Sequence, residues 1–277
     1  MYIFNLSISE NIMNGLKKAW LPAVILLVIA VIFAVLIVVL SKVLAVPVDE
    51  KEESIRENLA GANCGACGYA GCSDFAKALS LGKAELSSCS VTDKEHKQII
   101  AGILGVQSIV EETKVVVKCG GGQLCKDEFE YQGYQDCKSA NALNGGFKSC
   151  SAGCIGLSSC TAVCPTGAIL VDKNNKLASV SQEKCINCGL CISECPKSVV
   201  VKIPKTAKVL VACKNTNKGK DVKSICSVGC IACGICAKNC PEQCITMENN
   251  LPVIDYLKCT GCKTCVKKCP CHTIVEI

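Results

Sequence analysis

Residues 185–196 read CINCGLCISECP, in which four cysteines are spaced by two, two and three residues and a proline follows the last. In iron–sulfur proteins with this run, the first three thiolates bind one cube-shaped cluster and the fourth binds the neighbouring cluster. The same spacing recurs as CIACGICAKNCP over 230–241 and as CTGCKTCVKKCP over 259–270. The run therefore predicts several [4Fe-4S] clusters that are held in pairs.

The chain has 27 cysteines but only two histidines in 277 residues. Disulfide scaffolds belong to small secreted domains, and the sequence has no cleavable signal peptide, so disulfides do not explain this content. Structural zinc sites use paired C-x-x-C units, and a tetrahedral zinc ion has no use for a fourth cysteine that binds a neighbouring centre. A zinc-binding interaction module is kept as the alternative from another functional class.

The formal net charge of +6 counts every cysteine as neutral. Cluster ligands are thiolates, and five clusters of about −2 each would bring the net charge to roughly −4. Aromatic residues make up 4% of the chain, and Arg56 is its one arginine. The composition therefore argues against nucleic acid as a partner.

Residues 21–40 (LPAVILLVIAVIFAVLIVVL) contain no charged side chain, and Trp20 precedes them. This length and composition predict a single transmembrane helix within an N-terminal segment, 1–42. Because the span has no ionisable side chain, it is expected to act as a membrane anchor rather than an ion path. A charged linker, 43–58, is expected to follow it.

A small domain is predicted over 59–92, where interleaved glycines let the backbone approach a cluster closely. A helix is expected over 73–82, between the third and fourth cysteines of the domain. The expected ligands of one [4Fe-4S] cluster are Cys64, Cys67, Cys72 and Cys89.

Residues 93–149 are expected to connect this domain to the rest, with a helix over 92–107 and a strand over 111–119. The CGGG at 119–122 lacks the order of a phosphate-binding loop, and no flavin or nicotinamide site is recognisable. The sequence leaves open two interpretations of five further cysteines. In one, a sixth cluster forms from Cys119, Cys125 and Cys137 with either Cys213 or Cys226. In the other, they are spare thiols. Cys244 and Cys271 lie in strand-like stretches and are interpreted as spare thiols.

From residue 150 the chain contains an internal duplication, with one copy over 150–204 and the other over 205–277. Each copy has two cysteine runs, β-prone stretches after each Cys-Pro and a turn between them. This is the layout of the two-cluster bacterial ferredoxin. The predicted fold class is therefore α+β: one N-terminal transmembrane helix, a small four-cysteine [4Fe-4S] domain, and tandem two-cluster ferredoxin-like modules.

The exchange of the fourth ligand between paired clusters predicts three ligand sets directly. They are Cys185, Cys188 and Cys191 with Cys164; Cys230, Cys233 and Cys236 with Cys269; and Cys259, Cys262 and Cys265 with Cys240. The remaining run departs from the motif, because Leu157 stands where the second copy has Cys233. We expect Cys150 to replace it, which gives the set Cys150, Cys154, Cys160 and Cys195. The total is at least five [4Fe-4S] clusters, or six if the additional one forms.

Clusters saturated by four thiolates favour one-electron transfer over substrate chemistry, so no catalytic residue is assigned to the chain. Three features together resemble the B subunit of the Rnf complex: the membrane span followed by ANCGACGYAGC at 62–72, the YQGYQDC at 131–137, and the tandem ferredoxin-like modules. The resemblance covers essentially the whole chain, and the two modules suggest the long form of that subunit.

The Rnf family is a membrane-bound ferredoxin:NAD⁺ oxidoreductase that translocates Na⁺ or H⁺. The resemblance implies an electron carrier that takes electrons from soluble ferredoxin and passes them to flavin-bearing partner subunits. It also implies a single-pass protein of the cytoplasmic membrane with its clusters on the cytoplasmic side. An iron–sulfur subunit of another membrane hydrogenase or dehydrogenase complex is the alternative, and the transported ion stays open.

Overall fold

The computed structural model describes residues 24–41, 49–107 and 112–277. The chain divides into two compact units, residues 1–49 and 50–277.

The described part of the first unit is the helix Val24–Ser41. Its mean hydropathy is 3.6, and none of it is buried against the protein, so it is long and apolar enough to cross a membrane. It lies within the N-terminal segment in which the sequence predicts one membrane helix. Residues 1–23, which include Trp20, and residues 42–48, which include the start of the predicted linker, lie outside the described residues.

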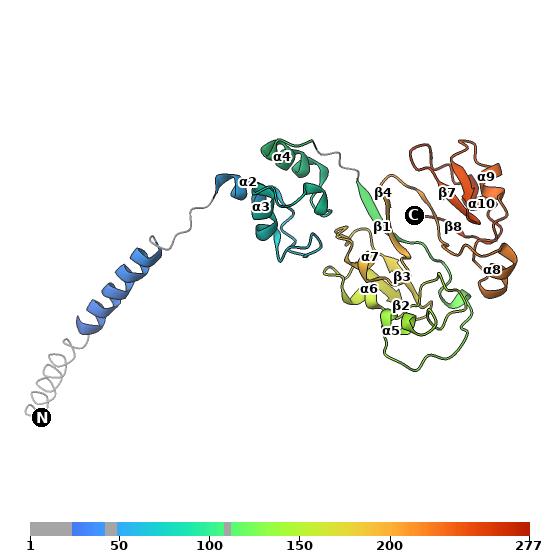
Figure 1. Cartoon of the computed structure of the whole chain (residues 1–277), viewed down its shortest axis with the longest axis horizontal. Coiled ribbons are helices and arrows are strands. Elements are labelled where there is room, and N and C mark those ends of the chain that lie inside the picture. The colour runs from blue at the N-terminus through green and yellow to red at the C-terminus, as the bar shows by residue number, and fades with distance from the viewer. Residues whose placement is uncertain (1–23, 42–48, 108–111) are drawn as a thin grey trace, which may run out of the picture. The chain divides into compact units, whose positions relative to one another are not determined.

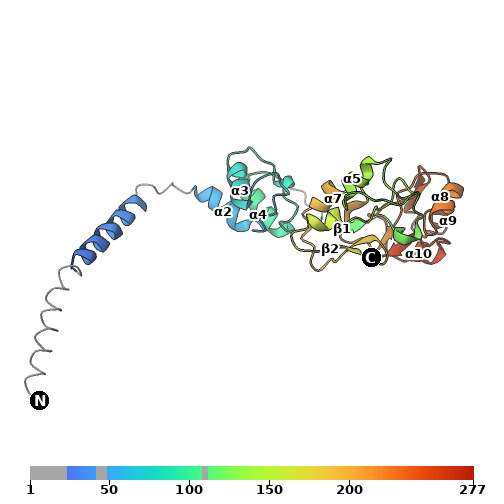
Figure 2. The same ribbon diagram turned by 90° about the horizontal axis from the view of Figure 1, so that it is seen from below.

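The second unit begins with a small helical region that carries the first four cysteines of the chain. Ile55, Phe75, Leu79 and Ile100 are almost completely buried and form its core. Asp93 caps the last helix by accepting a hydrogen bond from the His96 amide. Figure 2 shows the three α-helices of this region grouped together. Its elements are α2 (Glu50–Asn58), α3 (Cys72–Ser80), η1 (Leu86–Ser88) and α4 (Lys94–Leu104).

The next part, called here the first repeat, spans residues 113–204. Its first and last strands pair antiparallel, from Thr113 opposite Pro204 to Val117 opposite Val200, although most of the repeat separates them in sequence (Figure 1). A second antiparallel pair forms a hairpin, with Ile169 opposite Val180. The elements are β1 (Thr113–Val117), η2 (Gly122–Leu124), α5 (Cys137–Ala142), α6 (Ser159–Ala162), β2 (Ile169–Asp172), β3 (Leu177–Val180), α7 (Leu190–Glu194) and β4 (Val200–Pro204).

The second repeat, residues 209–276, has the same plan in a shorter form. Its outer strands pair antiparallel and its inner strands form a hairpin. Asn249 and Asn250 both have positive φ at the hairpin turn, a conformation that asparagine tolerates better than most residues. The elements are β5 (Val209–Val211), α8 (Gly219–Ile225), α9 (Ile235–Lys238), β6 (Ile245–Glu248), β7 (Leu251–Ile254), α10 (Thr264–Lys268) and β8 (Ile274–Glu276).

Backbone hydrogen bonds join the two repeats. The Gly120 amide donates to the Ala212 carbonyl at 2.9 Å, and the Lys126 amide donates to the Ile225 carbonyl at 2.8 Å. Cys125 and Cys226 form an isolated antiparallel bridge beside the second of these bonds. The loops after β1 and after β5 are thereby held against each other.

Candidate metal centres

Most cysteines of the second unit gather in small groups. Among the residues that the structure describes, no three His, Cys, Asp or Glu side chains lie close enough together to hold a single metal ion. The groups are therefore defined by the cavities that the cysteines line and by contacts between neighbouring thiols. We label them sites A to E and a central group.

Site D lies in the second repeat around the start of α9. Its four cysteines line one small cavity, and Cys271 lines it as well. The Thr273 amide donates to Cys269 Sγ at 3.3 Å. The structure thus brings together the set expected from the exchange of fourth ligands: Cys230, Cys233, Cys236 and Cys269.

Site E lies in the same repeat around the start of α10. Four cysteines line its cavity together with a fifth, Cys244, whose Sγ lies 3.4 Å from Cys240 Sγ. Cys236 of site D and Cys265 of site E pack into one hydrophobic core, so the two sites are neighbours. Site E consists of Cys240, Cys259, Cys262 and Cys265, as expected.

Site B is the corresponding group of the first repeat, around the start of α7. Cys191 lies near the other three members of the group and near Cys160. The Ala168 amide donates to Cys164 Sγ at 3.2 Å, four residues along the chain, as Thr273 does for Cys269. The set expected from the sequence is again brought together: Cys164, Cys185, Cys188 and Cys191.

Site C differs from the expected set in one member. The cavity beside α6 is lined by Cys137 and not by Cys150. Cys137 begins α5, and its amide donates to Ser159 Oγ at 2.7 Å, which fixes α5 against α6. Leu157, the residue that interrupts the motif, packs against the same core as Cys137. Site C consists of Cys137, Cys154, Cys160 and Cys195.

The structure places Cys150 between the two repeats, in what we call the central group. Cys150 packs there with Cys125 and Cys226 in one buried cluster. The adjacent Cys125 side chain lowers the pKa of both Cys150 and Cys226. All five members of the group line one cavity: Cys119, Cys125, Cys150, Cys213 and Cys226.

Site A lies in the helical region, on the loop before α3 and directly after η1. The Cys72 amide donates to Asn63 Oδ1 at 2.8 Å, which fixes the loop at the start of α3. Two glycines of the loop, Gly65 and Gly68, have positive φ and give it the tight course that the sequence predicts. Cys67, Cys72 and Cys89 pack against the common core. Site A consists of these three cysteines and Cys64.

The pKa values of these cysteines are consistent with binding to a group of several metal ions. Burial raises the pKa of Cys154 to about 12 and that of Cys230 to about 11. Burial, followed by the nearby Cys188 and Cys185, raises the pKa of Cys191 to about 12. Crowded, buried thiols of this kind ionise only when positive charge compensates them, and the iron ions of a cluster supply that charge. Four thiols in each of sites B to E fit the ligand set of one [4Fe-4S] cluster.

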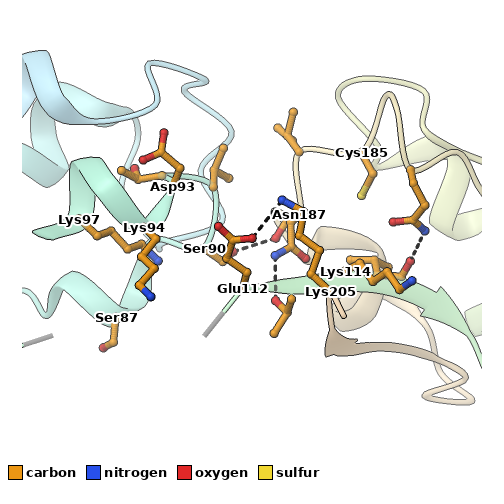
Figure 3. A pocket seen from close by; sticks show the side chains of 16 residues that line it. Ser87, Ser90, Asp93, Lys94, Lys97, Glu112, Lys114, Cys185, Asn187 and Lys205 are labelled. Atoms are coloured by element: carbon orange, nitrogen blue, oxygen red, sulfur yellow. Dashed lines mark hydrogen bonds and ion pairs between the residues drawn. The ribbon is translucent and has the colours of Figure 1, made fainter. Parts of the chain in front are cut away.

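A cavity of about 670 Å³ lies where the helical region contacts the first repeat. Figure 3 shows Ser90 next to Asn187 at this cavity. Ser90 Oγ donates to the carbonyl of Asn187 at 2.9 Å and to that of Cys188 at 3.3 Å. Ser90 follows Cys89 of site A directly, and Cys188 belongs to site B, so this contact links the two sites.

A buried cation stands beside this contact. Lys97 lies on α4 and is 7% exposed. Burial lowers the pKa of Lys97, and the nearby Cys89 makes the largest contribution in the opposite direction. Lys202 on β4 has a similar relation to Cys188. Burial lowers the pKa of Lys202, and Cys188 makes the largest contribution that raises it. Each of sites A and B therefore has a partly desolvated lysine near its thiols.

No pattern in the sequence signals the contact between Ser90 and the loop of site B, and none signals that Cys137 belongs to site C. A weak indication of Cys137 is the missing ligand at Leu157, which requires a replacement from elsewhere in the chain. Neither histidine lies in a cysteine group: His96 Nδ1 contacts Asp93 Oδ2 at 2.8 Å, and His272 follows Cys271 at a positive-φ position.

Comparison with known families agrees with this distribution of cysteines. Residues 59–91 match a family described as a putative Fe-S cluster, residues 147–196 a 4Fe-4S dicluster domain, and residues 252–275 a 4Fe-4S binding domain. Iron–sulfur clusters are therefore the cofactors of this chain.

Longer matches extend over most of the chain. The chain is 38% identical to the B subunit of the proton-translocating ferredoxin:NAD⁺ oxidoreductase complex of Clostridium ljungdahlii, over 79% of this chain and 78% of that protein. The chain belongs to the family of B subunits of ion-translocating oxidoreductase complexes. It is also 39% identical to the B subunit of the Na⁺-translocating ferredoxin:NAD⁺ oxidoreductase complex of Acetobacterium woodii, over 79% of this chain and 66% of that protein.

A third relative, the B subunit of an ion-translocating oxidoreductase complex of Methanosarcina acetivorans, is 37% identical over 66% of this chain and 70% of its own length. As a member of this B-subunit family, the chain is an iron–sulfur electron-transfer subunit of a multi-subunit enzyme complex. The apolar helix Val24–Ser41 indicates that it is associated with the membrane.

Proposed function

We propose that the chain takes electrons from reduced soluble ferredoxin and passes them along its clusters to flavin-bearing partner subunits, which reduce NAD⁺ while the complex translocates Na⁺ or H⁺. The observation that carries this proposal is the number of thiols in each site. Sites B to E each offer four cysteines to one position in the fold. Four thiolates leave no iron coordination position for a substrate, which favours electron transfer.

The neighbouring sites support a continuous route. Site A is joined to site B through Ser90, and Cys191 of site B lies near Cys160 of site C. Sites D and E share a hydrophobic core. In this arrangement the chain's own residues space the clusters, exclude water and donate amide hydrogen bonds to the thiolates.

The two repeats fit tandem two-cluster ferredoxin-like modules, one with sites B and C and the other with sites D and E. In this proposal the helix Val24–Ser41 is a single-pass anchor, and the cluster-bearing unit lies on the cytoplasmic side, where ferredoxin and NAD⁺ are found. β1, from the expected connecting region, pairs with β4, so we include it in the first module.

Iron and acid-labile sulfide should be measured first, on the full chain purified in detergent without oxygen. We expect about 20 of each per chain from sites A to E, and about 24 if one further cluster is present. The absorbance near 400 nm should fall when reduced ferredoxin is added, because the clusters accept its electrons. Zinc without sulfide, or clusters that reduced ferredoxin cannot reduce, would contradict the proposal.

Replacing Lys97 by methionine is expected to lower the reduction potential of the site A cluster by roughly 50 mV, because a nearby buried cation stabilises the reduced, more negative state. The measurement is a redox titration followed by EPR. Lys94→Met is the matched control, since Lys94 is exposed one turn earlier on α4 and lines the same cavity. Equal shifts in the two variants would show that Lys97 has no specific effect.

A further inference from the structure

The five cysteines of the central group belong to none of the ligand sets of sites A to E and lie where the two repeats meet. Three of them, Cys125, Cys150 and Cys226, form one buried cluster, and the backbone bridge between Cys125 and Cys226 holds two of them in place. They come from three loops that are far apart in the sequence. Incidental thiols have no reason to converge in this way, whereas the ligands of one centre do.

The surroundings of this cavity suit negatively charged sulfur. Asn215, which is buried, donates from Nδ2 to Cys150 Sγ at 3.3 Å. Lys148, also buried, lines the same cavity and pairs with Asp127 at 2.6 Å. A buried amide donor and a buried cation beside converging thiols are the features that stabilise a cluster with a net negative charge.

Gly121 leaves the space that such a cluster needs. A Cβ atom at this position would lie 3.4 Å from Cys226 Sγ, 3.7 Å from Cys119 Sγ and 3.2 Å from Cys125 Cβ. The backbone of Gly121 therefore passes directly beside three members of the central group, and a side chain there would crowd all three.

The two remaining members connect the central group to the sites on either side. The amide of Cys154, a member of site C, donates to Cys119 Sγ at 3.4 Å. The amide of Cys230, a member of site D, donates to Cys213 Sγ at 3.4 Å. The same contact is thus made once in each repeat, and the central group lies next to both site C and site D.

We propose that the central group holds a sixth iron–sulfur cluster, ligated by Cys125, Cys150, Cys226 and one of the flanking Cys119 and Cys213. It joins the two modules by passing one electron at a time between sites C and D, with no bond made or broken. This inference rests on the proposed electron-transfer function. The set predicted from the sequence is Cys119, Cys125 and Cys137 with Cys213 or Cys226. In the proposed set Cys150 replaces Cys137, Cys226 becomes a fixed ligand, and Cys119 becomes one of the two candidates for the fourth position.

The test uses the full chain, with Cys125→Ala, Cys150→Ala and Cys226→Ala made singly. Each variant is expected to lose about four iron and four sulfide per chain, from about 24 to about 20. Of Cys119→Ala and Cys213→Ala, at least one should show the same loss. Cys244→Ala is the control, since Cys244 is an additional thiol at site E, and it should lose none.

A loss in Cys150→Ala alone would return Cys150 to site C and overturn the sixth cluster. About 20 iron in the unaltered chain, with no loss in Cys125→Ala or Cys226→Ala, would also overturn it while sites A to E and the proposed function stand. The absence of sulfide would instead overturn the proposed function itself.

A second variant avoids removing a ligand. Asn215→Ala should keep all the iron but lower the potential of one cluster, because the hydrogen bond to Cys150 Sγ is lost. A redox titration followed by EPR should then show one component shifted and the others unchanged. Potentials identical to those of the unaltered chain would contradict ligation by Cys150.

Discussion

Replacing Cys64 by alanine is expected to remove the site A cluster completely, with a loss of about four iron and four sulfide per chain. The reason is the lack of a substitute, because residues 59–92 contain no cysteine other than the four of site A. In the assembled complex, reduced ferredoxin should still reduce the clusters of the two repeats. Electron delivery to the membrane partners should fall to background, because site A is the next site toward the membrane helix along the chain.

Iron, sulfide and ferredoxin-dependent NAD⁺ reduction are measured on the complex that contains the variant. Cys244→Ala serves as the control, since it removes a thiol that lies beside site E in excess of the four ligands, and it should change none of these quantities. If Cys64→Ala keeps its full iron content, the assignment of site A is wrong. If it loses the cluster but keeps full activity, electrons leave the chain from another site.

The sequence predicts best what depends on short spacings. The runs around Cys188, Cys233 and Cys262 specify three ligands and a short helix within a few residues, and the structure places a short helix over the third cysteine of each run. The hairpin turn at Asn249 and Asn250 follows from a residue type that tolerates positive φ. The mixed helix and strand content and the ferredoxin-like 4Fe-4S domains are confirmed on these grounds.

The sequence predicts poorly what depends on contacts between distant segments. Spacing alone assigns Cys150 to site C, because it is the nearest cysteine upstream of the interrupted run. The structure instead holds Cys150 beside Cys226, where backbone pairing joins the loops of the two repeats, and no local spacing encodes that pairing. Cys137 reaches site C because α5 packs against α6 through Ser159, a contact that also has no pattern in the sequence.

The contact between sites A and B also joins segments that are distant in the sequence. It depends on one serine hydroxyl, that of Ser90, which meets two carbonyl groups of a loop that is remote in the sequence. The occurrence of Ser90 directly after Cys89 does not indicate in the sequence that Ser90 contacts this loop. The ligands of single clusters can therefore be predicted from spacing, whereas the order in which the clusters are connected requires the tertiary structure.

Replacing Cys137 by alanine is expected to remove the site C cluster, with a loss of about four iron and four sulfide. The structural reason is that Cys137 lines the site C cavity as its fourth cysteine, while the first repeat has Leu157 where the sequence of the second repeat has Cys233. Transfer between site B and the second repeat should stop, because site C lies between site B and the central group.

The decisive experiment is a rescue. Leu157 packs against the same core as Cys137, so Leu157→Cys in the Cys137→Ala background places a thiol at the motif position and should restore both the iron and the transfer. Leu157→Ala in the same background is the matched control, since it makes the same room without supplying a thiol, and it should restore neither. Iron retained in Cys137→Ala itself would mean that another cysteine completes site C, and Cys150 would then be the first residue to replace. Restoration by Leu157→Cys alone would show that the first repeat keeps the same four-cysteine geometry as the second, with one ligand supplied from a distant helix instead of from the run.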